Sequence, residues 1–134
     1  MSKKIFVNLP VADLKKSMDF YTKIGFTNNP AFTDDTAACM VLTEDIYVML
    51  LTHDKFSQFS SKKIIDAKTS SGVINSISVD SLNEVNAMAD AALKAGGSEP
   101  SAPKDYGFMQ QRSFNDLDGN HWEVLYMDMS QVPG

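Results

Sequence analysis

The sequence has few of the residues that cross-links and transition-metal sites require. It contains one cysteine, Cys39, and two histidines among 134 residues. A single cysteine excludes an internal disulfide, and the neighbours Ala38 and Met40 favour a small core side chain over a reactive nucleophile. The expected fold therefore contains no internal disulfide bond.

Long apolar runs and basic runs are missing as well. The longest apolar run covers residues 46–51, far short of the roughly 20 residues that cross a bilayer, and the N-terminus lacks a signal-peptide core. Seventeen acidic residues stand against 12 basic ones, for a net charge of −5. We therefore expect a cytoplasmic protein with neither a membrane nor a nucleic acid as its partner.

The first half of the chain predicts one strand, one helix and three further strands. Leu14, Met18 and Tyr21 recur at helical spacing, and Asp13 and Gly25 suit the start and the end of that helix. The strands are expected at residues 3–9, 27–33, 36–43 and 46–52.

The second half repeats this order. Ser81 and Glu84 have the spacing of a capping box, ahead of a helix that ends at Gly96-Gly97. Strands are expected at residues 72–79, 108–115 and 120–126, with a weak strand within 98–106. Residues 53–71 between the halves are rich in turn-forming residues and indicate a connector.

The two halves also match in register. A shift of 68 residues carries Phe6 onto Ile74, and a shift of 73 carries Leu50 onto Glu123. An internal repeat of this kind predicts an α+β fold of two βαβββ modules. We expect one domain over residues 1–134, with module one at about 3–52, the connector at 53–71 and module two at about 72–128.

Glu123 is the most unusual residue of the second module. Asp118-Gly119 is a strong hairpin signal, because glycine accepts the positive φ that a tight turn demands. The strand beyond it carries Glu123 in an apolar run, where an unpaired carboxylate is costly. Glu123 therefore either pairs with a polar neighbour across the hairpin, such as Arg112, or faces a cavity, where it recognises a ligand or acts as a general base.

Two segments carry a family resemblance: VNLPVADLKKSMDFY at residues 7–21 and DLDGNHWEV at residues 116–124. They resemble the module signatures of the vicinal oxygen chelate superfamily, which includes glyoxalase I, bleomycin resistance proteins and extradiol dioxygenases. The resemblance implies two βαβββ modules that form a curled mixed sheet around a cavity, usually as a homodimer. It does not define a function, because members with this fold catalyse isomerisations or ring cleavages, or only sequester a ligand.

The resemblance also implies where a metal would bind. Metalloenzymes of this family use one ligand on the first and one on the last strand of each module, and these positions correspond to Phe6, Leu50, Ile74 and Glu123. Only Glu123 has a ligating side chain, whereas catalytic sites of this kind need about three protein ligands. We therefore expect neither a metal nor another cofactor.

Two polar residues extend the predicted site. By the period of two along a strand, Asn8 shares a face with Phe6, and His121 shares a face with Glu123. His121 and Glu123 together would form half of an irregular metal site. The candidate catalytic group is Glu123, and the candidate ligand-binding residues are Phe6, Asn8, Leu50, Ile74 and His121.

The leading hypothesis is a protein that binds a small, partly apolar organic molecule in its cavity without a metal, as bleomycin resistance proteins do. The alternative is an enzyme of the glyoxalase or extradiol dioxygenase type. Such an enzyme would be a lyase, an isomerase or a dioxygenase that uses either an irregular metal site or Glu123 as its base.

Overall fold

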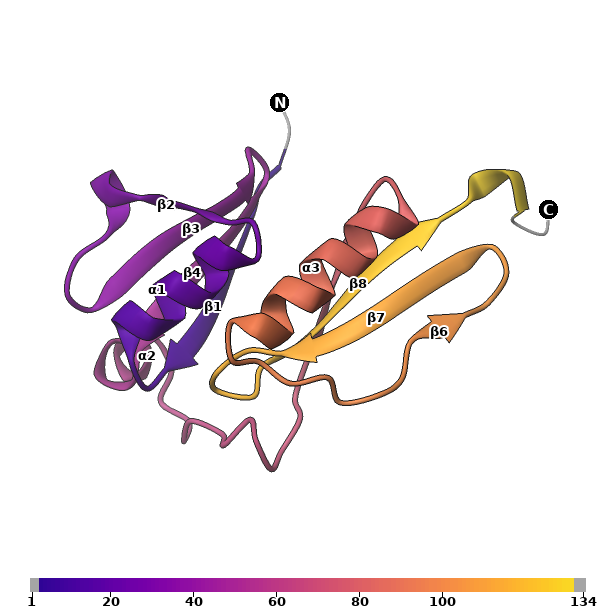
Figure 1. Ribbon diagram of the computed structural model, residues 1–134. Coiled ribbons are helices and arrows are strands. Elements are labelled where there is room, and N and C mark those ends of the chain that lie inside the picture. Colours follow the sequence, from indigo (N-terminus) through magenta and orange to yellow (C-terminus); the bar gives the residue numbers. More distant parts are fainter. Residues whose placement is uncertain (1–2, 132–134) are drawn as a thin grey trace. The chain divides into compact units, whose positions relative to one another are not determined.

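A computed structural model of the protein describes residues 3–131. The chain divides into two compact units, with the boundary between Asp66 and Ala67. Each unit contains a four-stranded mixed sheet; the first unit has the helices α1 and α2, and the second has α3 (Figure 1). The single domain expected over residues 1–134 stays a prediction.

The first unit contains β1 (Ile5–Val11), α1 (Leu14–Lys23), β2 (Thr27–Asn29), η1 (Pro30–Phe32), β3 (Ala37–Thr43), β4 (Ile46–Thr52) and α2 (His53–Phe59). Its sheet has the order β1-β4-β3-β2. Strands β1 and β4 run parallel, and the other two pairs are antiparallel.

The second unit contains β5 (Ile74–Ser78), α3 (Leu82–Lys94), β6 (Lys104–Asp105), β7 (Met109–Asn115), β8 (His121–Met127) and η2 (Met129–Gln131). Its order, β5-β8-β7-β6, repeats that of the first sheet, including the parallel pair. The predicted α+β fold of two βαβββ modules is confirmed, and neither sheet closes into a barrel.

The helix ends confirm the capping signals. The Asp13 carboxylate accepts a hydrogen bond from the Lys16 backbone N–H at 3.1 Å. The Ser81 hydroxyl accepts from the Glu84 N–H at 3.1 Å, and the Glu84 carboxylate accepts from the Asp80 N–H at 2.9 Å. Within residues 3–131 no helix is both long enough and apolar enough to span a bilayer.

In each unit the helix buries one face of the sheet, as Figure 1 shows for α1 and α3. Fully burying a large apolar side chain contributes about 1.5–3 kcal/mol, so this face stabilises each module. The buried residues include Leu9, Val11, Phe20, Tyr21, Val48 and Leu50 in the first unit, and Val85, Ala89, Phe114, Trp122 and Val124 in the second.

Two segments differ from the sequence prediction. The strand expected at residues 27–33 ends at Asn29, because Pro30 has no N–H for the sheet and the Asn29 side chain accepts from the Ala31 N–H at 3.1 Å. The predicted connector contains α2, which begins where the Thr52 hydroxyl accepts from the Lys55 N–H at 3.3 Å.

The β7–β8 hairpin depends on Asp116 and Gly119. One Asp116 carboxylate oxygen accepts from the N–H groups of Asp118 and Asn120, at 3.0 and 2.8 Å. Gly119 has a φ of +90°. A Cβ atom at Gly119 would lie 2.8 Å from the backbone of Ala67 and Lys68, so glycine is required by both the conformation and the space.

We predict that Gly119→Ala lowers the free energy of unfolding by about 2 kcal/mol or more, because it adds a backbone clash to the strain of a positive φ. The matched control is Gly107→Ala, since Gly107 has a similar φ of +83° and open space around it. Urea unfolding of both variants checks this. Equal losses in the two variants would contradict the role assigned to the contact with Ala67.

Candidate functional site

The candidate site lies on the face of the second sheet that α3 leaves uncovered. Trp122 and Val124 of β8 are buried, at 2% and 0% exposure, on the face that α3 packs against. Since side chains alternate along a strand, Glu123 lies on the opposite face. We call this the open face of module two; its residues are Ile74, Ser76, Gln111, Ser113, His121, Glu123 and Leu125.

Two neutral side chains fix the Glu123 carboxylate. Ser76, its register partner on β5, donates its hydroxyl hydrogen to Oε1 at 3.0 Å. Gln111 on β7 donates from Nε2 to Oε2 at 3.3 Å. Within residues 3–131 no basic side chain forms an ion pair with Glu123. Hydrogen bonds therefore define the position of the carboxylate, but no cation among residues 3–131 pairs with its negative charge.

Of the polar neighbours across the hairpin, Arg112 is not the partner of Glu123, because it lies on the other face of the sheet. Its Nε and Nη2 atoms donate to Glu99 at 3.0 and 3.2 Å, and Nη1 donates to Asp90 at 2.8 Å and to Asn86 at 3.3 Å. The hydrogen bonds to Glu99 raise the pKa of the Arg112 guanidinium. The polar neighbour across the hairpin that contacts Glu123 is Gln111.

His121 adds a second polar atom to the open face. It lies two residues from Glu123 and pairs in register with Ile74. Its Nε2 atom is buried and has no hydrogen-bond partner within the described residues. An unpaired buried polar group costs about 1–3 kcal/mol.

The described residues do not fit a metal centre. Residues 3–131 contain no group of three or more histidine, cysteine, aspartate or glutamate side chains that is arranged to hold an ion. His121 and Glu123 supply two ligands of the required types, and the paired residues Ile74 and Ser76 add an alkyl group and a neutral hydroxyl. No chemical step is assigned to a metal.

Phe6 and Asn8 lie on the corresponding face of the first sheet. Phe6 is 50% exposed and stacks on its register partner Tyr47, with ring centroids 4.4 Å apart. Asn8 pairs in register with Met49, and its side-chain amide donates to the Phe6 carbonyl at 3.3 Å. This face therefore presents aromatic, thioether and amide groups.

Leu50 is placed differently from its prediction. It pairs in register with Leu9, is 0% exposed and belongs to the core face of the first sheet. Met49 corresponds to Glu123, since Met49 pairs with Asn8 as Glu123 pairs with Ser76. The superposition of Leu50 on Glu123 is therefore wrong by one residue.

The one-residue error in the superposition arises because the loops of the two hairpins differ in length. The β3–β4 turn leaves two residues between the paired Thr43 and Ile46, with a register shift before it, whereas five residues separate the paired Asn115 and His121. A shift of one residue moves a side chain to the other face. Parallel pairing counted from Phe6 would have identified Met49.

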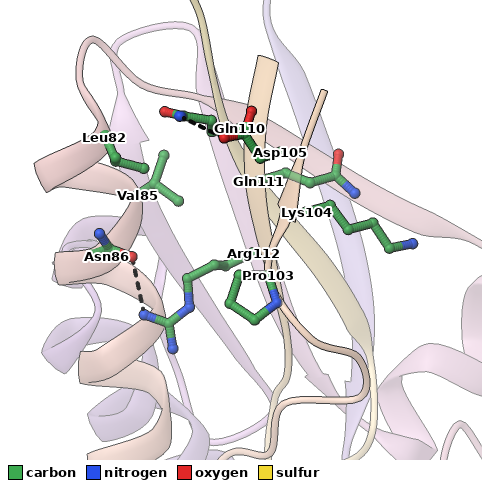
Figure 2. Close-up of a pocket in the computed structure, with 9 residues that line it drawn as sticks. All are labelled: Leu82, Val85, Asn86, Pro103, Lys104, Asp105, Gln110, Gln111 and Arg112. Carbon is green, nitrogen blue, oxygen red and sulfur yellow. Dashed lines mark hydrogen bonds between the residues drawn. The ribbon is translucent and has the colours of Figure 1, made fainter. Parts of the chain in front are cut away.

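The other face of the second sheet holds a cavity of about 200 Å³ between α3 and the β6–β7 pair. Figure 2 shows Arg112 reaching from β7 towards Asn86 on α3, with Gln110 beside Asp105 at the opposite end. The side chains of Lys104 and Gln111 point away from α3 (Figure 2). The lining residues are Leu82, Val85, Asn86, Pro103, Lys104, Asp105, Gln110, Gln111 and Arg112.

Comparison with known proteins identifies the family. The model of the Glyoxalase/Bleomycin resistance protein/Dioxygenase superfamily matches residues 5–124, and the chain belongs to this superfamily. Comparison with curated proteins gave no match.

Solved structures share the fold over nearly the whole chain. Hypothetical protein SA1046 from S. aureus matches with a TM-score of 0.79 and 26% identity, over 94% of each chain. A superfamily domain from Frankia sp. EAN1pec matches with a TM-score of 0.71 and 25% identity, over 95% of this chain and 93% of that one. A superfamily enzyme from Burkholderia phytofirmans PsJN matches with a TM-score of 0.77 and 17% identity, over 94% of this chain and 99% of that one. This last likeness concerns the fold alone.

Proposed function

We propose that the protein binds a small, partly apolar organic molecule on the open face of module two, with Glu123 as the polar anchor and without the metal usual in its superfamily. The observation that carries this proposal is the Glu123 carboxylate, which two neutral donors orient and which no cation within residues 3–131 neutralises. A fixed acceptor of this kind suits a ligand that supplies a hydrogen-bond donor.

The surroundings of Glu123 support a mixed polar and apolar ligand. A carboxylate has about four acceptor positions, and Ser76 and Gln111 use two of them. Ile74, which is 49% exposed, supplies an alkyl surface. His121 lies on the same strand face as Glu123 and adds an imidazole ring to it.

In the first module, taken by itself, we propose Phe6 and Asn8 as ligand-binding residues. Phe6 offers half of its surface for apolar contact, and Asn8 offers an amide on the same strand face. Leu50 supports the module from within its core, since it is 0% exposed. Neither Phe6 nor Ile74 has a ligating atom, and this favours binding without a metal.

A second candidate function is metal-independent catalysis with Glu123 as the general base of a lyase or isomerase. The observation that favours it is the orientation of both carboxylate oxygens by Ser76 and Gln111, because a general base must be held within hydrogen-bond reach of the proton it removes. The same residues then serve for binding and for chemistry.

We predict that Glu123→Gln leaves the melting temperature unchanged or raises it, because the amide keeps an acceptor for Ser76 and removes an unbalanced charge. Molecules that raise the melting temperature of the wild type in a screen of small organic compounds should lose that effect in the variant. Differential scanning fluorimetry measures both quantities.

The matched control is Glu99→Gln, which removes a carboxylate that is paired with Arg112. It should lower the free energy of unfolding by about 1–3 kcal/mol, because the pair with Arg112 is partly buried. A clearly lower melting temperature for Glu123→Gln, similar to that of the control, would assign Glu123 a purely structural role and contradict the proposal.

We also propose that the protein is a homodimer. Both sheets are open, and exposed sheet edges are usually paired or covered; symmetric dimers are the commonest oligomers. Light scattering coupled to size exclusion should return twice the chain mass of 14.8 kDa. A monomer mass at high micromolar concentration would contradict this.

The proposed cytoplasmic location rests on the sequence alone.

A further inference from the structure

The cavity between α3 and the β6–β7 pair lies on the face of the second sheet opposite to Glu123. Its volume of about 200 Å³ is below the 300–1,000 Å³ of pockets that hold drug-sized ligands. It therefore suits a molecule with the size of a single substituted ring. Because all of its lining residues belong to the second unit, the cavity is complete within that module.

The walls of this cavity are apolar along the sides and polar at the ends. Leu82 and Val85 line the α3 side, and Pro103 lines the side of the β6 segment (Figure 2). Gln110 and Asp105 lie at one end, where the Gln110 amide donates to Asp105 at 3.4 Å. Arg112 lies at the other end.

The charges around the cavity favour a cation and disfavour an anion. The Arg112 guanidinium is already paired with Glu99 and Asp90, so it is not available to an incoming carboxylate. Asp105 adds a third carboxylate at the opposite end, and no basic side chain within residues 3–131 forms an ion pair with it. Lys104 points away from α3 (Figure 2).

The geometry points to a second ligand site in this cavity. We propose that it binds a small amine or similar cation with an apolar body. The ammonium group lies against the Asp105 carboxylate and the side-chain carbonyl of Gln110. The apolar body packs against Leu82, Val85 and Pro103. This site goes beyond the proposed function, because it uses the opposite face of the sheet and does not involve Glu123.

Three probes of matched shape test the proposal on the full-length protein: benzylamine, benzyl alcohol and benzoate, which are cationic, neutral and anionic. Amide chemical shifts in ¹⁵N-labelled protein report where each probe binds. Benzylamine should give saturable shifts at residues 82–86 and 103–112, with a dissociation constant on the order of 1–10 mM, as expected for a fragment. Benzyl alcohol should bind more weakly, and benzoate should give no saturable shift there.

Asp105→Asn tests the anchoring charge. The variant keeps the side-chain oxygen that accepts from the Gly107 N–H at 2.8 Å, so the loop is retained. It should weaken benzylamine binding about two- to fivefold, the range for a solvent-exposed ion pair, and leave benzyl alcohol binding unchanged. Asp19→Asn on α1, in the first unit, removes the same charge and should change neither.

Three results would overturn the proposal: benzoate binding as tightly as benzylamine, no saturable shift in the cavity residues, or equal weakening by the Asp105 and Asp19 variants. Glu123→Gln separates this site from the proposed function. If that variant abolishes the benzylamine shifts, the probe binds the open face and the second site is wrong. If it leaves them intact while eliminating the hits of the compound screen, the two sites are independent.

Discussion

The burial of Trp122 and Val124 beneath α3 determines how the second module presents its functional groups. Both side chains are almost inaccessible, and exposing either would lose a large part of the core stabilisation of this module. Because strand residues alternate between faces, this burial forces His121 and Glu123 onto the open face. The same alternation on β7 sends Phe114 and Arg112 towards α3 and Gln111 towards Glu123.

The sequence predicted the fold because its local signals agree with one another. The Asp13 cap, the Ser81–Glu84 box and the hairpin at Gly119 all occur where the repeat requires them, and agreement across levels is what specifies one structure. The residues of α2 were interpreted as part of a connector because the turn-forming residues 60–63 and 69–72 follow them directly. Its N-cap at Thr52 doubles as the last residue of β4, which obscures the signal.

The site was harder to predict, because its contacts depend on register. The hydrogen bonds of Glu123 with Ser76 and Gln111 join three strands, and the distance along the chain does not reveal which residues meet. Leu50 was misplaced by one residue because the two hairpins differ in loop length. Arg112 was an attractive partner for Glu123 by charge, but its pairing with Glu99 satisfies it on the other face.

We propose that Glu123 anchors an organic ligand rather than a metal ion. The most direct test is elemental analysis of protein purified without chelators, with Glu123→Gln purified in parallel. Both proteins should contain much less than one equivalent of Zn, Ni, Fe or Mn per chain, because the described residues supply too few ligands. About one equivalent in the wild type that is lost in the variant would contradict it.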